Sequence, residues 1–238
     1  MNPEKLFKWR HFQADFILLC VRWYLRYPLS YRNLEEMMRE RGLTVAHTSI
    51  YRWVVVYSPE LNQRCRPHLQ QTNDSWRVDE TYIKVKGDWK YLYRAIDSHG
   101  QTIDFLLSDN RDAPAAKTFF LKAFGHSDSR KIRVINTDQD KAYPKAIKDL
   151  KESGILPDSV EHRAVKYMNN IIEQDHRYIK QRIIASQHFR EFDSARRTIS
   201  GYESMNMIRK GQIQNVEKGD VIGQINYINS LFGITVSI

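Results

Sequence analysis

The hydrophobic pattern of this chain changes its period near residue 75, and that change limits the folds that the chain can adopt. Before it, apolar residues recur at steps of three and four, the spacing of helices that are buried along one side. After the polar segment 71–75, stretches rich in β-branched and aromatic residues alternate with short turns, as in β-strands. We therefore predict an all-α domain over residues 1–70 and an α/β domain after it.

Three helices are predicted in the N-terminal segment. The first covers residues 10–27 and ends before Pro28, which stops it. Ser30 can cap the second helix, and Gly42 is placed to end that helix in a left-handed conformation. The third helix begins near His47, and its apolar residues fall at i, i+3, i+4 and i+7. Two short helices joined by a glycine-containing turn are typical of a helix-turn-helix.

The outer side of the third helix carries the kinds of groups that a recognition helix presents to the major groove. These residues are Thr48, Ser49, Tyr51 and Arg52. Thr and Ser hydroxyls can hydrogen-bond base edges or phosphates, and Arg52 can pair with guanine or hold a phosphate. The alternative is a small helical bundle that has no role in nucleic-acid binding.

Charge is distributed unevenly along the chain, whose formal net charge is +9. Residues 1–70 hold 11 Lys/Arg and 6 Asp/Glu, a net of +5, and residues 71–160 hold 15 and 14, a net of +1. Residues 161–213 return to +4, from 10 and 6. A solvated face explains any single basic run, but two of them around an Asp-rich segment suit a polyanion that is bound and processed at the centre.

The second part of the chain predicts a mixed sheet with helices packed on it. Three consecutive strands form an antiparallel meander, and a helix, a strand and a helix follow. In order, these elements cover residues 76–85, 89–96, 102–107, 113–124, 132–136 and 141–152. A further helix over residues 194–209 carries two basic pairs and is expected to complete the fold or to contribute a DNA or dimer surface.

Three acidic residues stand where such a sheet can gather a site. Asp79 lies within the first strand, Asp138 follows the fourth strand, and Glu173 begins a long helix that runs to about Ala185. Side chains alternate between the two faces of a strand, so Asp79 and Glu80 point oppositely and we expect only one of them to serve a given site. The ends of strands in open α/β sheets are where ligands bind.

Each of these acids also has an explanation that involves no chemistry. Asp138 can cap the helix that follows, Glu173 can stabilise a helix N-terminus, and Asp79 can pair with a basic residue. The set favours a catalytic site because Lys180 follows Glu173 by two helical turns, and the two therefore share a helix face. His176 is expected on that face too, whereas Asp175 is expected to point away from it.

Three segments closely resemble the transposases of the insertion-sequence-six family. They are residues 78–85, residues 136–143, and residues 169–177 with Lys180. The 34 residues between Asp138 and Glu173, and the lysine seven positions after that glutamate, match the acidic signature of the family. Residues 31–34 and 49–53 also look like its members, so the similarity covers nearly the whole chain.

This resemblance implies a ribonuclease H-like α/β fold, preceded by an all-α helix-turn-helix domain. Domains are then expected at residues 1–70 (DNA binding) and 71–213 (catalysis), with a C-terminal tail at 214–238. The implied activity is cleavage of DNA and strand transfer by a freed 3′-hydroxyl. Two Mg²⁺ ions roughly 3.5–4 Å apart, for which Mn²⁺ can substitute, would relieve the repulsion among the three carboxylates.

Roles follow for the candidate residues. Asp79 is expected to bridge the ions, while Asp138 and Glu173 each complete one. Lys180 is expected to contact a phosphate of the element end, and Arg177 is a further candidate for DNA binding. His176 is expected either to contact DNA or to support a metal ligand from behind. The expected partners are double-stranded DNA, both as terminal inverted repeats and as target, and at least one more copy of the chain, because two ends must be brought together.

The expected location is the bacterial cytoplasm, in association with the nucleoid. No stretch approaches the roughly 20 apolar residues that cross a bilayer, so we expect neither a membrane span nor a signal peptide. Cys20 and Cys65 fit neither a zinc pair nor a disulfide framework and are expected to be thiols.

Two other kinds of protein stay open at this point. One is a helix-turn-helix regulator whose larger domain senses a ligand, although the sequence holds no Gly-rich phosphate loop, nucleotide fingerprint or zinc-ligand cluster. The other is a hydrolytic nuclease, such as a junction resolvase, which cuts DNA with the same metals but never joins an end to a target.

Overall fold

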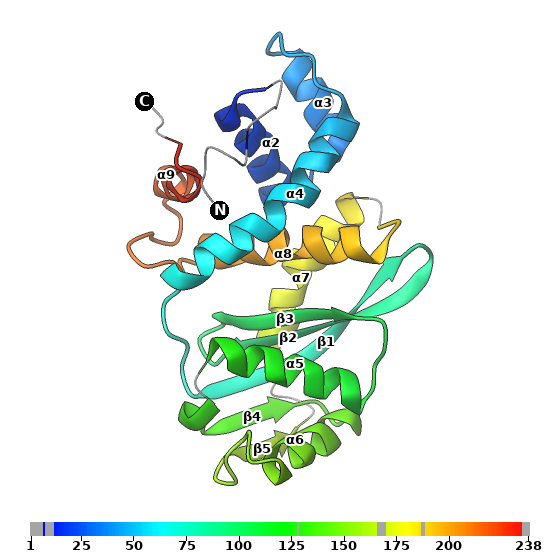
Figure 1. Cartoon of the computed structure of the whole chain (residues 1–238), viewed down its shortest axis with the longest axis vertical. Coiled ribbons are helices and arrows are strands. Elements are labelled where there is room, and N and C mark those ends of the chain that lie inside the picture. Colours follow the sequence, from blue (N-terminus) through cyan, green and yellow to red (C-terminus); the bar gives the residue numbers. More distant parts are fainter. Residues whose placement is uncertain (1–6, 8–11, 128, 166–169, 187–188, 235–238) are drawn as a thin grey trace. The chain divides into compact units, whose positions relative to one another are not determined.

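A computed structural model describes residue 7 and residues 12–127, 129–165, 170–186 and 189–234 (Figure 1). The chain divides into two compact units. The first combines Met1–Gln70 with Gln181–Ile238 and is called the helical unit below, and the second, Gln71–Lys180, is called the sheet unit. Among the described residues, no helix combines the length and the apolar character that a membrane crossing requires.

The sheet unit is built on five strands in the order β3-β2-β1-β4-β5. β1 pairs antiparallel with β2, and β2 with β3, whereas β1, β4 and β5 run parallel. Their bounds are β1 Ser75–Val85, β2 Asp88–Asp97, β3 Thr102–Ser108, β4 Val134–Thr137 and β5 Glu161–Ala164. An antiparallel meander extended by parallel strands on the side of β1 is the ribonuclease H-like arrangement, so the predicted fold class is confirmed.

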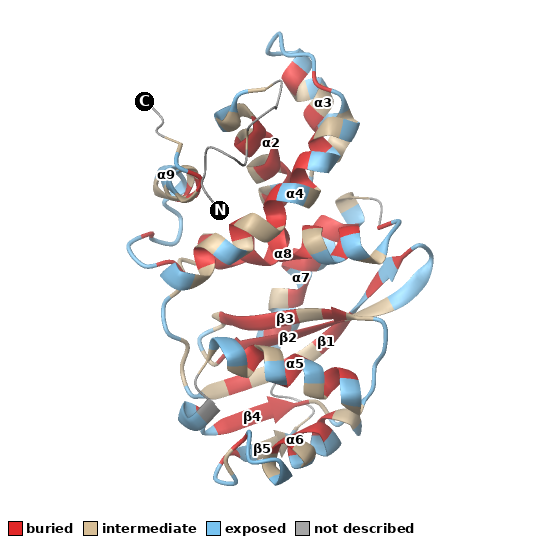
Figure 2. Ribbon diagram, viewed as in Figure 1, coloured by how far each residue is buried: buried red, intermediate tan, exposed pale blue. Residues whose placement is uncertain are grey.

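Helices α5 (Ala113–His126) and α6 (Ala142–Glu152) supply the main apolar core of this unit. The side chain of Asp112 accepts a hydrogen bond from the backbone N–H of Ala115 at 2.8 Å and so begins α5. Apolar residues of the two strands β1 and β2, namely Trp76, Val78, Tyr93 and Ala95, belong to one buried cluster with residues of the two helices, among them Phe119, Phe120, Tyr143 and Ile147. Figure 2 shows this buried layer in red on the sheet and on the inner sides of the helices.

The helical unit contains the predicted N-terminal helices. They are α2 Ala14–Arg26, α3 Tyr31–Arg39 and α4 His47–Cys65. Ser30 and Asn33 form a reciprocal capping box at the start of α3, and Gly42 after it has a φ of 74°, so both predicted helix signals are confirmed. Short 3₁₀ helices cover Arg66–His68 after α4 and Ser129–Lys131 before β4.

Two later helices, α8 (Phe192–Arg209) and α9 (Val221–Leu231), complete the helical unit. α8 packs closely on α4, and Gly201 makes that approach possible. A Cβ atom at Gly201 would lie 2.4 Å from Oγ of Ser58 and 2.8 Å from Cδ2 of Leu25. A side chain at this position therefore forces α8 away from its neighbours.

The structure differs from the predicted organisation after residue 180. Residues 181–213 were expected in the catalytic domain, but they group with the N-terminal helices because α8 packs on α4 and α2. The segment expected as a tail contains α9, and β5 was not predicted at all. The division into functional domains at 1–70, 71–213 and 214–238 stays a prediction.

Candidate metal centre

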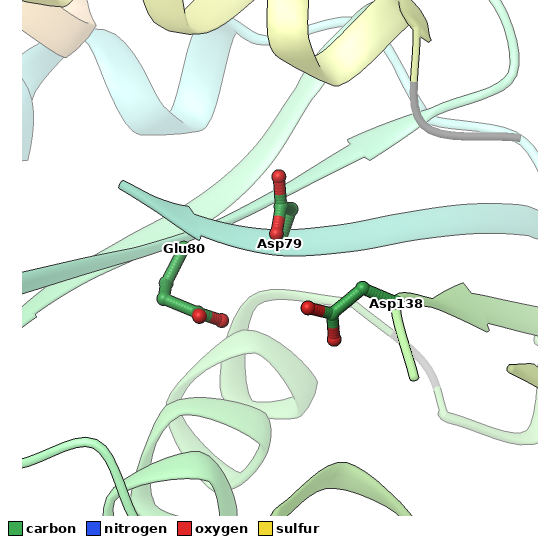
Figure 3. Close-up of side chains that lie close together, drawn as sticks. All are labelled: Asp79, Glu80 and Asp138. Carbon is green, nitrogen blue, oxygen red and sulfur yellow. The ribbon is translucent and has the colours of Figure 1, made fainter. Parts of the chain in front are cut away.

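The pairing of β1 with β4 brings two of the predicted acids together. These parallel strands are paired up to Arg77 and Asn136, and Asp79 and Asp138 each follow two residues later. Asp138 is held in place there because its Oδ1 accepts a hydrogen bond of 3.1 Å from the backbone N–H of Asp140. Figure 3 shows the carboxylate of Asp138 facing β1 from the end of β4.

A third carboxylate of this cluster belongs to Glu80. Oxygen atoms of Asp79, Glu80 and Asp138 all lie within 4.8 Å of one another. The two neighbours on β1 do leave the strand on opposite sides (Figure 3), but the side chain of Glu80 is long enough to return toward Asp138. Leaving the strand on opposite sides therefore does not keep the oxygens of Asp79 and Glu80 apart, and the expectation that only one of them serves the site stays a prediction.

Asp79 occupies an environment that disfavours its charge. Burial raises the pKa of its carboxyl group to about 7, with further increases from the charges of Glu80 and Asp138. No Lys or Arg of the described residues lies within 4.0 Å of this carboxylate, and its nearest ionisable partner is Nδ1 of His176 at 3.9 Å. An ion pair with Lys or Arg therefore does not explain why an acid stands at position 79, whereas a bound metal cation would neutralise its negative charge.

Glu80 has polar partners on the other face of the sheet. It accepts hydrogen bonds from the hydroxyl of Tyr143 and from Nε of Arg111, the latter at 2.5 Å. Burial raises the pKa of Glu80, while the hydrogen bond from Tyr143 and the charge of Arg111 lower it. Arg111 also lies 3.2 Å from Asp140 and 3.6 Å from Asp138. These bonds fix Glu80, so it is a weaker candidate for a metal ligand than Asp79 or Asp138.

The donor set fits a hard divalent cation. Every group of the cluster offers carboxylate oxygen, which is the ligand that Mg²⁺ and Mn²⁺ accept, and no soft sulfur ligand belongs to it. Asp79 and Asp138 are both half-buried, so the repulsion between them is less screened than between two carboxylates in water. The site therefore has both the ligands and the electrostatic need for a metal.

Glu173 lies in the first turn of α7 (Asn170–Ala185) and does not join this group of oxygens. Its side chain is exposed, and its charge is the smallest of the causes that raise the pKa of Asp79. Arg177 and Lys180 are exposed on the same side of the helix, as expected. Glu173 thus stands near the cluster, on a helix that also carries the His176 contact to Asp79.

His176 does not share the outer face of α7. Only 5% of its surface is exposed, and burial followed by the charge of Arg94 lowers its pKa to about 2, so the imidazole is neutral. At 100° per residue, position i+3 lies about 60° from Glu173, and here that rotation turns the ring toward the sheet. The buried ring lies against Asp79, which favours the expected role behind a candidate ligand over the expected DNA contact, and both stay predictions.

Asp175 anchors α7 to the sheet, a role that the sequence did not reveal. Its Oδ2 lies 2.5 Å from a guanidinium nitrogen of Arg94, whose side chain is 0% exposed. Arg94 is the partner of Asp79 in the pairing of β1 with β2, so the anchor sits beside the candidate ligand. The signal that could have indicated this role is an arginine within the run of buried residues that forms the second half of β2.

The candidate DNA-reading residues lie at the start of α4. Thr48, Tyr51 and Arg52 are exposed and Ser49 is half-buried. The apolar side of the helix is buried as predicted, with Ile50, Trp53, Val54 and Tyr57. The exposure that a recognition helix needs is present, and contact with DNA stays a prediction.

Comparison with known proteins adds sequence relatives to this geometry. Residues 73–212 match the model of a family described as a DDE domain, that of IS240-type transposases. The chain is 41% identical over 208 residues to the transposase for insertion sequence-like element IS431mec of Staphylococcus aureus, covering 86% of this chain and 88% of the relative. It is 40% identical over 208 residues, with the same coverage, to the transposase of insertion sequence IS257 in transposon Tn4003 of that species.

Solved structures with a similar backbone include retroviral integrase cores. The HTLV-2 integrase catalytic core in complex with magnesium has a TM-score of 0.42 at 15% identity, covering 55% of this chain and 84% of that one. The catalytic core of BIV integrase has a TM-score of 0.43 at 15% identity, covering 58% and 84%.

Proposed function

Because this chain belongs to the DDE-domain transposases of insertion sequences, we propose that it binds the ends of such an element and moves them by metal-dependent cleavage and joining of DNA. The observation that carries this proposal is the meeting of Asp79 and Asp138 at the end of two parallel strands, where no Lys or Arg of the described residues lies within 4.0 Å of Asp79. The joining product is a 3′-end of the element linked to target DNA.

Asp79, Asp138 and Glu173 are the residues that would hold the metal. When bound, two Mg²⁺ or Mn²⁺ ions would neutralise these carboxylates and stabilise the attacking and the leaving oxygen of the phosphodiester exchange. Glu173 is included because it lies about one helical turn before His176, and His176 lies 3.9 Å from Asp79. The side chain of Glu173 is exposed, so a different rotamer can bring its carboxylate to the cluster. Glu80 stays with Tyr143 and Arg111.

The remaining residues of the sheet unit position these acids and the DNA. The Arg94–Asp175 pair fixes the first turns of α7 on β2, which limits where Glu173 can lie. Lys180 and Arg177 are exposed along the side of α7 that carries Glu173, so they can bind phosphates of the element end next to the acids.

The helical unit is proposed to recognise the terminal inverted repeats. Arg52, with Thr48, Ser49 and Tyr51, would enter the major groove from the start of α4. Two ends must meet for joining, so we propose that the active form is a homodimer or a larger homo-oligomer on DNA.

An in vitro joining reaction tests the proposal. Labelled element-end DNA and a plasmid target are incubated with the protein in Mg²⁺ or in EDTA, and the wild type is compared with Glu173→Gln. The matched control is Glu152→Gln, an exposed glutamate of α6 that lies outside the acidic cluster. Joined product that needs Mg²⁺, persists in the control and disappears in Glu173→Gln supports the proposal.

Three other outcomes contradict it. Joining that survives EDTA excludes the metal mechanism. Cutting without joining under every condition identifies a hydrolytic nuclease. If the Asp79→Ala variant binds DNA and keeps the full biological effect of the wild type, the protein is a regulator.

A further inference from the structure

The hairpin formed by β1 and β2 extends beyond the rest of the sheet. β3 pairs with β2 only as far as Tyr91, so residues 83–90 continue past it as a two-stranded ribbon (Figure 1). The ribbon closes through Lys86 and Gly87, whose φ values of 53° and 92° are those of a tight type I′ turn. A two-stranded ribbon without a third strand has little hydrophobic core of its own. Packing therefore does not explain why large side chains are exposed on it.

One face of this ribbon carries three aromatic rings and a lysine. Tyr82 pairs with Tyr91, and Lys84 with Trp89, and residues that are directly opposite in a ladder share a face. Tyr82 is 45% and Trp89 55% exposed. We call Tyr82, Lys84, Trp89 and Tyr91 the aromatic face.

Contacts within the aromatic face hold its rings together. Tyr82 and Trp89 remain exposed, whereas Tyr91 is half-buried and packs against the core. The ring of Tyr82 lies 5.4 Å from that of Tyr91 and 6.2 Å from that of Trp89, measured between centroids. The ammonium group of Lys84 lies 5.1 Å from the centroid of Trp89. On the opposite face of the ribbon, Ile83 and Val85 are buried, so only one side is available to a ligand.

The chemistry of the aromatic face suits a nucleic acid better than a protein. Lys84 lies on the aromatic face and Lys86 lies in the turn, against the single acid Asp88, so the surroundings of the rings carry a net positive charge. Lys90 points to the other face and is paired with Asp109 at 2.6 Å. Exposed rings stack on bases, whose π-faces are available only when a base is unstacked, and neighbouring lysines neutralise phosphates. Large aromatic rings that are exposed on a surface either mark an interaction site or promote aggregation.

Arg111 connects the aromatic face to the acidic cluster. Its guanidinium carbon lies 5.7 Å from the centroid of Tyr82, and its Nε lies 2.5 Å from Glu80. Arg111 also lies 3.6 Å from Asp138. A DNA strand that reaches the acidic cluster from the side of Arg111 therefore also passes the aromatic face, only a few nucleotides from the phosphodiester at the acids.

We propose that the aromatic face binds a nucleotide unstacked from the DNA beside the phosphodiester that is cut or joined, with its base on Trp89 and Tyr82 and its phosphates near Lys84 and Lys86. This inference rests on the proposed function, since it assumes that DNA is the substrate of the acidic cluster. It adds a binding surface in the sheet unit to the one expected on α4, and this second surface recognises an unpaired base rather than a sequence.

Binding to a tailed duplex tests the inference. The probes are a short fluorescent duplex of arbitrary sequence with an unpaired thymine tail and the same duplex with blunt ends, both measured in EDTA with the full chain. Stacking of one base contributes about 1–3 kcal/mol, so Trp89→Ala should weaken binding of the tailed probe about 5- to 150-fold and leave the blunt probe unchanged. Trp89→Phe should keep most of the preference for the tail.

Leu121→Ala is the matched control, because it truncates another exposed apolar side chain of the same unit. It should leave both affinities at their wild-type values, and equal thermal unfolding midpoints for the variants exclude a folding defect. A 2-aminopurine base in the tail should be quenched by the wild type and not by Trp89→Ala. Equal binding of the tailed probe by the wild type and by Trp89→Ala overturns the inference.

Two further outcomes separate the possible failures. If the aromatic face instead seats a second copy of the chain, Trp89→Ala lowers the molar mass measured by light scattering and leaves tail binding intact, which also overturns the inference. If tail binding depends on Trp89 but no joining occurs in Mg²⁺, the proposed function fails while the binding surface stands.

Discussion

Replacing Asp175 by alanine should destabilise the sheet unit far more than the loss of an ordinary ion pair. The partner side chain, Arg94, is 0% exposed and Asp175 is 11% exposed, with 2.5 Å between nitrogen and oxygen. Asp175→Ala therefore removes a carboxylate partner from a guanidinium group that water does not reach. Removing one partner of a buried pair costs about 3–5 kcal/mol, whereas an exposed pair contributes about 0–1 kcal/mol.

Urea denaturation of Asp175→Ala measures this cost. Glu152→Ala is the control, because it removes an ion pair with Lys148 in which both side chains are largely exposed, and its denaturation midpoint should equal that of the wild type. The double variant Arg94→Met with Asp175→Leu should recover most of the lost stability, since it leaves no buried charge. The reasoning is refuted if Asp175→Ala unfolds at the same midpoint as Glu152→Ala.

Three further predictions concern packing, DNA binding and the cluster. Gly201→Ala should lower the free energy of unfolding by about 1–3 kcal/mol because its Cβ has no space, whereas Gly125→Ala in α5, which meets no atom within 4 Å, should raise it by up to about 1 kcal/mol; urea denaturation measures both. Arg52→Ala should weaken binding of element-end DNA by about 1–3 kcal/mol in a fluorescence anisotropy titration, and an unchanged affinity, equal to that of Lys148→Ala, would show that α4 does not bind DNA. Glu80→Gln keeps an acceptor for its hydrogen-bond donors, so the Mg²⁺ concentration for half-maximal joining should not change; a clear increase would make Glu80 a ligand.

Much of the fold follows from local signals in the sequence. The strands of the meander and the helices α3 to α6 have a clear hydrophobic pattern, and the structure has them near the predicted positions. Side-chain caps add a second local signal at the start of α3 and of α5. β5, Glu161–Ala164, has neither: it consists of four residues that are exposed or half-buried, and it is a strand only because β4 pairs with it. The residues of β5 alone therefore do not indicate that it pairs with β4.

The grouping of α8 with the N-terminal helices is also a tertiary effect. α8 is buried on nearly all sides, so its sequence shows no single apolar stripe that would indicate its partner. The fit of Gly201 against Ser58 and Leu25 brings together residues far apart in the chain.

At the candidate site, spacing and strand position identified Asp79 and Asp138 as neighbours, and the structure brings them together. The rule of alternating faces does not keep Glu80 away from the other two acids, because it describes where a side chain leaves the strand and not how far it reaches. The burial of His176 reflects a rotation of about 60° from Glu173, which decides between a buried and an exposed side of a helix. Glu173 stays a prediction, since its exposed side chain lies outside the cluster of oxygens.

Anomalous diffraction from a crystal of the full chain grown in Mn²⁺ tests the central claim most directly. The account predicts an anomalous peak in contact with carboxylate oxygens of Asp79 and Asp138, with the side chain of Glu173 turned toward it. A peak bound by Glu80 in place of Glu173, or no peak between Asp79 and Asp138, would contradict it.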